Sequence, residues 1–244
     1  MDVYWLEQQA GDVPTGNFWL SANESACLGR LHVPKRRADW RLGRWTAKCA
    51  VSACLGLPGD EAAMANIEVR PKPSGAPEAF FDGRPAGIAI SLSHTQGTGL
   101  CAISAARAAV GCDLETVEAR SPAFLADYFT HEERTAVAAA SLALRDLLIT
   151  VLWSAKESAL KAVGCGLRED TRAVYAVPDG VEPADGEWRP LAVRRIGGAG
   201  FSGWWRCSGG IVRTVVAEPP PHLPIALPLL ERSLAAGSAL AARC

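Results

Sequence analysis

The chain has 244 residues and a net charge of −1; 49% of its residues are hydrophobic and 21% are charged. These values are typical of a globular protein with one large domain or two small ones. A near-neutral charge, without aromatic residues among the basic ones, argues against nucleic acid as a partner. No apolar run has the length of a membrane helix.

The N-terminus has no basic stretch followed by an apolar one, so we expect no signal peptide and a cytoplasmic protein. The eight cysteines include no Cys-x-x-Cys pair. In a chain without a secretion signal, we expect these thiols to be reduced and mostly buried, with neither a disulfide frame nor a zinc site.

Residues 1–29 predict a strand followed by a short helix, and residues 30–48 predict a basic helix. The basic residues that share one side of this helix are Arg37, Arg41, Arg44 and Lys48. This side is either a solvated face or a phosphate-binding face, because arginine forks match phosphate oxygens in a bidentate way.

The next stretch predicts strands joined by turns. Residues 67–70 alternate like a short strand, and residues 71–77 form a loop rich in proline and glycine. Residues 88–93 and 100–103 alternate as the two arms of a hairpin, with His94 entering its turn.

Residues 110–115 predict a strand with two acids on one face. Asp113 and Glu115 share this face with Gly111, and their Cα atoms should lie about 6.6 Å apart. Three interpretations stay open: a solvated sheet edge, a magnesium site, or an acid/base pair of the kind that hydrolyses glycosides. The basic residues nearby favour a phosphate-linked metal site.

Residues 121–163 predict helices. Ser121-Pro122 caps one helix, and Thr130 with Glu133 forms a capping box for the next. Helical character then continues to Val163, with a break near residues 145–146 and an end at the glycines 164 and 166.

The last part of this helix places charges beside an apolar face. Lys156 falls within the apolar face, and Glu157 and Lys161 lie on its shoulder. These residues form either a lysine that extends its ammonium to solvent plus a surface ion pair, or a site where a carboxylate and two ammonium groups meet a charged ligand.

The C-terminal third predicts strands at 173–177, 188–193, 201–207 and 211–217. Gly198, Gly200 and Gly203 spell Gly-x-Gly-x-x-Gly, but strand-like residues follow, so we predict a hairpin turn and no dinucleotide loop. The tail from residue 218 is rich in proline and then alanine, and is either a peripheral helix or poorly ordered.

Two of these segments carry motifs of a known family. Val-Gly-Cys-Asp-Leu-Glu at 110–115 and Trp-Ser-Ala-Lys-Glu-Ser-Ala-Leu-Lys at 153–161 resemble the two signatures of the Sfp-type 4′-phosphopantetheinyl transferases. Ser-Leu-Ser-His at 91–94 and Phe-Thr-x-x-Glu at 129–133 also fit. The likeness covers roughly residues 30–180.

The resemblance implies an α/β (α+β) fold that is a pseudo-dimer of two similar halves. Each half would be a small antiparallel sheet packed with a long helix, with coenzyme A in the cleft between them. We expect an N-terminal half at 1–108 on the side of the coenzyme's 3′-phosphate, a C-terminal half at 109–217 with the metal site and the catalytic helix, and a tail at 218–244.

The resemblance implies magnesium-dependent transfer of the 4′-phosphopantetheine arm of coenzyme A to a serine of a carrier protein, with release of adenosine 3′,5′-bisphosphate. Asp113, Glu115 and Glu157 would hold Mg²⁺ or Mn²⁺. Glu157 would take the serine proton, and Lys161 would act on the phosphates; these two are the predicted catalytic residues. Predicted contacts to coenzyme A come from Arg44, Lys48, Arg70, Lys72, Ser93, His94, Lys156 and Lys161.

The sequence departs from the family in one place. Family members often have Gly-Lys-Pro where this chain has Gly75-Ala76-Pro77, without the lysine. Arg70 or Lys72 would supply the missing charge.

The expected partners are coenzyme A and apo carrier proteins of fatty acid, polyketide or nonribosomal peptide synthesis, with no nucleic acid and no membrane, and the expected state is a monomer. Two alternatives remain. One is a magnesium-dependent phosphohydrolase or nuclease that uses the same acids, and the other is a module that binds coenzyme A or a carrier without chemistry.

Overall fold

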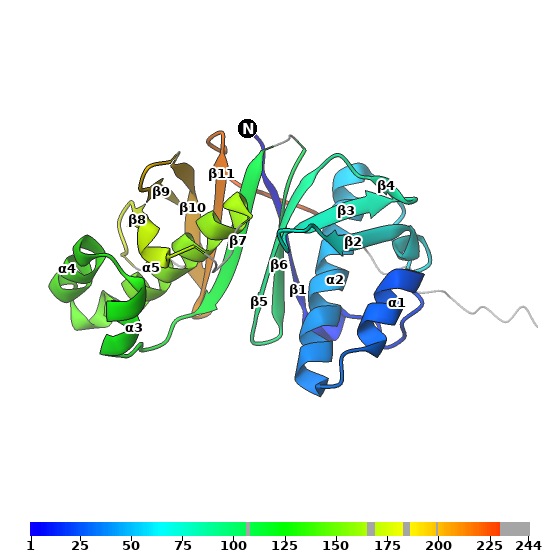
Figure 1. Ribbon diagram of the computed structural model, residues 1–244, viewed down its shortest axis with the longest axis horizontal. Helices are drawn as coiled ribbons and strands as arrows, with labels where there is room; N and C mark the ends of the chain where they lie inside the picture. The colour runs from blue at the N-terminus through cyan, green and yellow to red at the C-terminus, as the bar shows by residue number, and fades with distance from the viewer. Residues whose placement is uncertain (106–107, 165–168, 183–185, 199, 230–244) are drawn as a thin grey trace, which may run out of the picture.

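The computed structural model describes residues 1–105, 108–164, 169–182, 186–198 and 200–229. It consists of two halves that lie side by side (Figure 1). Each half has an antiparallel sheet packed against one long helix, α2 in the first half and α5 in the second. The predicted fold class is therefore confirmed.

The first half contains β1 (Tyr4–Gln9), α1 (Ala22–Gly29), α2 (Pro34–Leu55), β2 (Ile67–Pro71), β3 (Pro77–Phe81), β4 (Arg84–Pro85), β5 (Ala89–Thr95) and β6 (Thr98–Ser104). The second contains β7 (Ala109–Thr116), α3 (Pro122–Tyr128), α4 (His131–Ala139), α5 (Leu142–Val163), β8 (Val174–Pro178), β9 (Arg189–Arg195), β10 (Phe201–Ser208) and β11 (Ile211–Glu218). These bounds confirm the predicted strands and helices except at the break between α4 and α5.

With β12 (Ile225–Ala226), the sheets have the strand orders β12-β1-β6-β5 and β7-β11-β10-β9-β8, and β2, β3 and β4 form a small third sheet. The two larger sheets meet where β7 lies against β5. There the backbone N–H of Cys112 donates to Ser91 Oγ at 3.0 Å, which joins the halves beside the predicted acidic strand.

The long helices begin and end at residues suited to those positions. Pro34 opens α2, where its missing N–H costs nothing, and Gly56 closes it with a left-handed φ of 64°. Gly164 closes α5 in the same way with a φ of 78°. The short helices α1 and α4 both begin with capping boxes, Ser21 with Glu24 and Thr130 with Glu133.

The break between α4 and α5 differs from the prediction. It lies at Ala140 and Ser141, whose ψ angles of 146° and 152° are extended, and not near residues 145–146. Arg145 and Asp146 continue the helix instead. Arg145 donates its backbone N–H to Ser141 O at 3.0 Å and a guanidinium N–H to Ala140 O at 3.4 Å, which satisfies carbonyls at the break.

Three apolar clusters form the core: one under each long helix and a third between the halves. The buried residues of the third are Val3, Leu100, Ala102, Val110, Cys112, Leu114, Val215 and Ala217. Val3 precedes β1 and the others come from β6, β7 and β11, so the junction of the halves is a packed interior.

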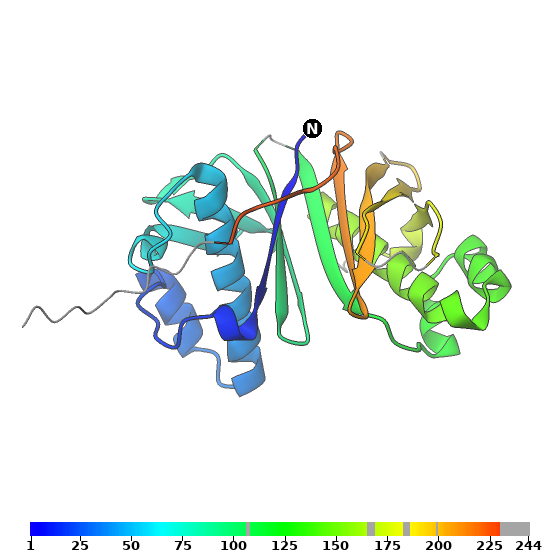
Figure 2. The ribbon, with the colours of Figure 1, turned by 180° about the vertical axis from the view of Figure 1, so that it is seen from behind.

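The segment after β11 returns to the first half (Figure 2). Its strand β12 (Ile225–Ala226) pairs in parallel with β1. Residues 219–229 are thus extended along the first half, which corrects the expectation of a peripheral or poorly ordered tail for this part; residues 230–244 lie outside the described residues. None of the described helices is long and apolar enough to cross a membrane.

Candidate active site

Strand β7 carries its two acids toward helix α5. Asp113 is 3% exposed, so the interpretation as a solvated sheet edge is wrong. Gly111 lies on the same face and allows the close approach of the helix, because a Cβ there would be 1.8 Å from Ser158 O. The glycine therefore brings the acids and α5 into one site.

Lys161 reaches Asp113 from α5. Its Nζ donates to Asp113 Oδ1 at 2.7 Å, to Ser93 Oγ at 3.1 Å and to Cys112 O at 3.2 Å. Ser93, on β5 of the other half, also donates to Asp113 Oδ1 at 2.8 Å. Burial lowers the pKa of Lys161, but the charge of Asp113, its hydrogen bond to Lys161 and the nearby Cys112 and Glu157 together outweigh burial, so the net pKa is raised and Lys161 is cationic at neutral pH.

Glu115 is held by two donors of its own half. Trp153 Nε1 donates to Oε1 at 3.0 Å, and Arg120 Nη2 donates to Oε2 at 3.3 Å. Burial, followed by repulsion from Asp113, raises the pKa of Glu115. Both carboxylate oxygens are thus positioned before any ligand arrives.

Glu157 projects from α5 toward the same acids. Its pKa is raised to about 7, first by burial and then by the Asp113 charge, with Lys161 acting in the opposite direction. Its Oε1 is buried without a hydrogen-bond partner. A buried carboxylate oxygen without a donor destabilises the folded state through its lost hydration, and a bound proton or cation would remove this destabilisation.

The acids fit a divalent cation by their chemistry. Asp113 Oδ2 and Glu157 Oε1 are both buried without a donor, and all three acids are oxygen ligands of the kind that Mg²⁺ prefers. Among the described residues, no group of three or more histidine, cysteine, aspartate or glutamate side chains is already arranged as a metal site. Lys161 and Arg120 neutralise Asp113 and Glu115 in this arrangement.

The structure gives Lys48 and Lys156 other partners than coenzyme A. Both side chains are 0% exposed, and they pair with Glu24 at 2.5 Å and with Glu133 at 2.7 Å. A ligand in solution cannot reach a fully buried ammonium whose hydrogens are all used. This corrects the prediction that these two lysines contact the coenzyme.

The basic side of α2 is largely used within the first half. Arg37 donates to the carbonyls of Leu28 at 2.5 Å and Leu31 at 2.8 Å, and Arg41 donates to Gly16 O at 3.1 Å. These two arginines therefore hold the loops around α1. The stripe is neither a simple solvated face nor a continuous phosphate-binding face.

Arg44 differs from the other basic residues of α2. Its guanidinium stacks over Trp40 at 4.9 Å and lies 4.0 Å from Glu24 Oε1. Its Nε is buried without a hydrogen-bond partner, and its side chain is 18% exposed. The residue thus retains unused donors.

The remaining predicted coenzyme residues lie on β2, β5 and the loop after β2. Arg70 is half-exposed and pairs with Glu68 at 2.7 Å, while Lys72 and His94 are exposed. A Cβ on Gly164 would be 3.9 Å from Ala76 Cβ, so the loop that follows Lys72 approaches the end of α5. Ser93 is the one of these residues that contacts the acids.

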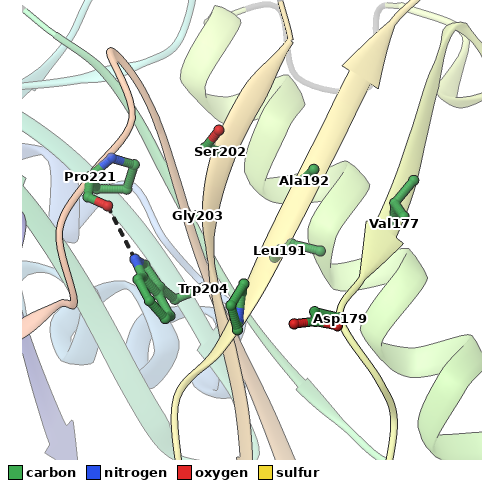
Figure 3. A pocket seen from close by; sticks show the side chains of 9 residues that line it. Val177, Asp179, Leu191, Ala192, Ser202, Gly203, Trp204 and Pro221 are labelled. Carbon is green, nitrogen blue, oxygen red and sulfur yellow. Dashed lines mark hydrogen bonds between the residues drawn. The ribbon is translucent and has the colours of Figure 1, made fainter.

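A separate cavity of about 320 Å³ lies on the sheet of the second half (Figure 3). Its lining residues are Val177, Asp179, Pro190, Leu191, Ala192, Ser202, Gly203, Trp204 and Pro221. It contains none of the predicted site residues, and the indole N–H of Trp204 is already used by Pro221 O at 3.2 Å. We therefore assign the chemistry to the acids and not to this cavity.

Comparison with known proteins bears on this acidic site. The family model of the 4′-phosphopantetheinyl transferase superfamily matches residues 109–217, which include Asp113, Glu115, Glu157 and Lys161. Residues 109–217, somewhat less than half of the chain, are thus similar to the 4′-phosphopantetheinyl transferase superfamily. The resemblance of the sequence motifs is thus confirmed at the level of the superfamily.

One curated relative in this superfamily is the 4′-phosphopantetheinyl transferase HetI of Nostoc sp.. It is 27% identical over 150 residues, a stretch that covers 61% of this chain and 61% of the relative's length. The aligned part thus spans less than two thirds of either protein.

The sequence motifs missed three contacts that shape the superfamily site. Trp153 opens the motif at 153–161 without a predicted role, yet its indole N–H donates to Glu115 Oε1 at 3.0 Å. Arg120 was not considered, although it pairs with the same carboxylate at 3.3 Å. The burial of Lys156 was also missed; the capping box at Glu133 was visible in the sequence, but nothing in its spacing indicates that the two residues pair.

Proposed function

We propose that this protein is an Sfp-type 4′-phosphopantetheinyl transferase, which moves the phosphopantetheine arm of coenzyme A to a serine of a carrier protein. The observation that supports this most is the convergence of Asp113, Glu115 and Glu157 with the cationic Lys161 on one site. Asp113 Oδ2 and Glu157 Oε1 have no hydrogen-bond donor within the described part of the chain and can therefore bind a metal ion. The ammonium of Lys161 beside them can bind phosphate oxygens.

In this proposal Asp113, Glu115 and Glu157 hold Mg²⁺, or Mn²⁺ in its place. A metal held by these residues would supply positive charge to the pyrophosphate and to the leaving phosphate. Arg120 and Trp153 keep Glu115 oriented from the side of α3 and α5.

Glu157 takes the proton of the carrier serine, directly or through a water, because it is a carboxylate of the site with a buried oxygen, Oε1, that has no hydrogen-bond donor among the described residues. The serine oxygen forms a bond to the phosphorus that carries pantetheine. The bond from this phosphorus to adenosine 3′,5′-bisphosphate breaks, and Lys161 protonates or screens the departing oxygen.

The coenzyme would lie between the halves, with Ser93, His94, Arg70 and Lys72 on its pyrophosphate side and Arg44 on its 3′-phosphate. The division at 1–108 and 109–217 belongs to the same proposal, as does a cytoplasmic monomer. The carriers would come from fatty acid, polyketide or nonribosomal peptide synthesis.

Intact mass spectrometry of an apo carrier protein tests the function. The carrier is incubated with the protein, MgCl₂ and coenzyme A, and should gain one phosphopantetheine. The gain should disappear with chelator and with Asp113→Ala. The matched control Asp127→Ala, on α3, should keep it.

Two other results would contradict the proposal. Bound coenzyme with no gain on any of the three kinds of carrier would favour the non-catalytic binding module. Cleavage of coenzyme A without a carrier would favour the phosphohydrolase.

A further inference from the structure

Two buried ion pairs occupy corresponding places in the two halves. Lys48 on α2 pairs with Glu24 on α1, and Lys156 on α5 pairs with Glu133 on α4. The four side chains are at most 3% exposed. In both pairs the lysine comes from the long helix and the glutamate from the short helix before it.

The contacts of the two lysines also agree. Lys48 Nζ donates to Trp19 O at 2.9 Å and Met64 O at 3.0 Å. Lys156 Nζ donates to Tyr128 O and Thr171 O, each at 3.0 Å. With its glutamate, each lysine thus uses all three of its N–H groups.

The two glutamates have equal surroundings as well. Each is the third residue of its helix and closes a capping box. Each also accepts from a strand, Glu24 from Val69 N at 3.0 Å and Glu133 from Ala176 N at 2.9 Å. We call the Lys48–Glu24 network the N-clamp and the Lys156–Glu133 network the C-clamp.

Each clamp ties its long helix to a short helix and to the first strand of the outer hairpin. A buried ion pair adds little net stability, since desolvation of the two charges offsets their attraction. Such a network does fix the position and rotation of the helix that carries the lysine. Side chains near the lysine on the same helix therefore keep their positions only while the clamp is intact.

In the first half the dependent side chain is Arg44, one turn before Lys48. Glu24 Oε1 is 4.0 Å from Arg44 Nε, and this Nε has no hydrogen-bond partner. The carboxylate instead faces Lys48 at 2.5 Å. Because Lys48 neutralises Glu24 at 2.5 Å, the Arg44 guanidinium is held only by the longer 4.0 Å contact with this carboxylate and stays available for an anion.

In the second half the residue one turn before Lys156 is the apolar Leu152, and the residue after it is Glu157. The residue after Lys48 is Cys49, which is buried and not acidic. The N-clamp therefore lies beside Arg44, a guanidinium that can donate to phosphate. The C-clamp lies beside Glu157, a carboxylate whose Oε1 has no hydrogen-bond partner in the part of the chain that the structure describes.

We propose that the duplicated clamps are positioning devices with different tasks: the N-clamp keeps Arg44 free for a phosphate of the substrate, and the C-clamp orients Glu157 toward Asp113 and Glu115. The lysines and glutamates of the clamps touch neither substrate nor metal. This inference rests on the proposed transferase function for its kinetic test.

Lys48→Met and Lys156→Met form a matched pair, because each removes the same charge from the same network. Both should lower the melting temperature by similar amounts. Lys48→Met should raise the KM for coenzyme A by about tenfold or more, with a small change for 3′-dephospho-coenzyme A, as Arg44→Ala should. Lys156→Met should instead lower kcat by about tenfold or more and weaken Mg²⁺ binding, with KM for coenzyme A little changed.

The milder variants Glu24→Gln and Glu133→Gln should repeat this division if the lysine variants fold poorly. Equal changes of kcat and KM in both halves, or mere loss of folding in all four variants, would overturn the proposal and leave the clamps purely structural.

If the wild-type protein transfers no phosphopantetheine, the proposed function is wrong. Titration calorimetry of coenzyme A and Mg²⁺ binding then tests the positioning role by itself. Coenzyme A binding should then still weaken with Lys48→Met and Mg²⁺ binding with Lys156→Met. Unchanged affinities in both titrations would overturn the positioning role.

Discussion

Glu157 has the most perturbed environment among the acids of the site. Its pKa is raised to about 7 because the carboxylate is buried and faces the charge of Asp113. In the absence of a cation it is therefore partly protonated at neutral pH. A cation bound by the acids would displace this proton, and the Glu157 oxygen that does not bind the cation could then accept the serine proton.

The first prediction concerns this carboxylate. Glu157→Gln should lower the transfer rate by roughly 10²–10⁴-fold, since the amide cannot accept the serine proton. Its melting temperature should not fall, because the substitution removes a buried charge that is repelled by its neighbours. Steady-state kinetics and thermal unfolding measure both effects.

The control is Glu132→Gln, which changes an exposed glutamate on α4. It should transfer at the wild-type rate. A wild-type rate for Glu157→Gln would remove Glu157 from the proposed role.

The second prediction concerns pH. The pKa of Glu157 in the folded protein, about 7, exceeds its ordinary value of 4.5. The folded state therefore holds a proton that the unfolded chain has lost within this window, so the contribution to the free energy of unfolding is full below 4.5 and falls as the pH rises toward 7. Glu157→Gln lacks this contribution.

Urea unfolding in the presence of chelator, from pH 4.5 to pH 8, tests this sign. The stability of the wild-type protein should decline relative to that of Glu157→Gln as the pH increases. Two parallel profiles would show that the carboxylate does not have a raised pKa.

At this scale the sequence places the acids and Lys161 on one strand and one helix, and the structure brings Lys161 to 2.7 Å from Asp113. The sequence could not predict that Lys48 and Lys156 form buried ion pairs, because their partners Glu24 and Glu133 come from other helices. An apolar helix face predicts burial of a lysine, but only the tertiary structure shows what neutralises it.

The contact between β7 and α5 is the element on which the site geometry depends. Asp113 and Lys161 can pair at 2.7 Å because the helix lies directly on the strand at Gly111. Even a methyl group at this position would meet the helix backbone at Ser158. Backbone atoms cannot move aside as a flexible side chain can.

Gly111→Ala should therefore destabilise the protein by about 3 kcal/mol or more through overpacking. It should also lower transfer in whatever protein remains folded. The measurement is urea unfolding together with activity per folded molecule.

Gly29→Ala is the matched control, since nothing lies within 4 Å of a Cβ at Gly29. It should leave both quantities unchanged. A stable and fully active Gly111→Ala protein would contradict the close packing of α5 on β7.

Elements with a clear period were predictable, as the alternation at 110–115 and the capping box at Thr130 show. The break before α5 was not. The polar pair Arg145–Asp146 suggested an end, but both residues are compatible with a helix interior. The helix instead ends where the backbone of Ala140 and Ser141 is extended, and neither side chain indicates this conformation.

At the scale of the molecule, one ion pair joins the halves outside the apolar cluster between them. Arg213 on β11 binds Glu7 on β1 with contacts of 2.5 and 2.9 Å. The side chains are 7% and 19% exposed. Loss of the glutamate would leave a largely buried guanidinium without its countercharge.

Glu7→Ala should therefore lower the free energy of unfolding by about 3 kcal/mol. Unfolding should remain a single transition, because the third apolar cluster still joins the halves. Urea unfolding followed by tryptophan fluorescence and circular dichroism measures both quantities. The matched control Arg172→Ala breaks an exposed ion pair and should change neither, whereas equal effects of the two variants would contradict a structural role for the contact between halves.

The two-half architecture followed from the family resemblance, whereas the path of the C-terminal segment did not. Residues 225–226 pair with β1, which is separated from them by almost the whole chain. Proline-rich sequence indicates an extended segment, but the partner strand of such a segment is set by the tertiary fold.

In the proposed reaction, coenzyme A is cleaved only as its phosphopantetheine arm is transferred to a carrier. The most direct measurement quantifies adenosine 3′,5′-bisphosphate and modified carrier in the same reaction, with and without the carrier protein. The proposal predicts one nucleotide released for each carrier serine modified, and none without carrier. Release of the nucleotide without carrier, at the rate seen with it, would contradict the claim and identify a hydrolase.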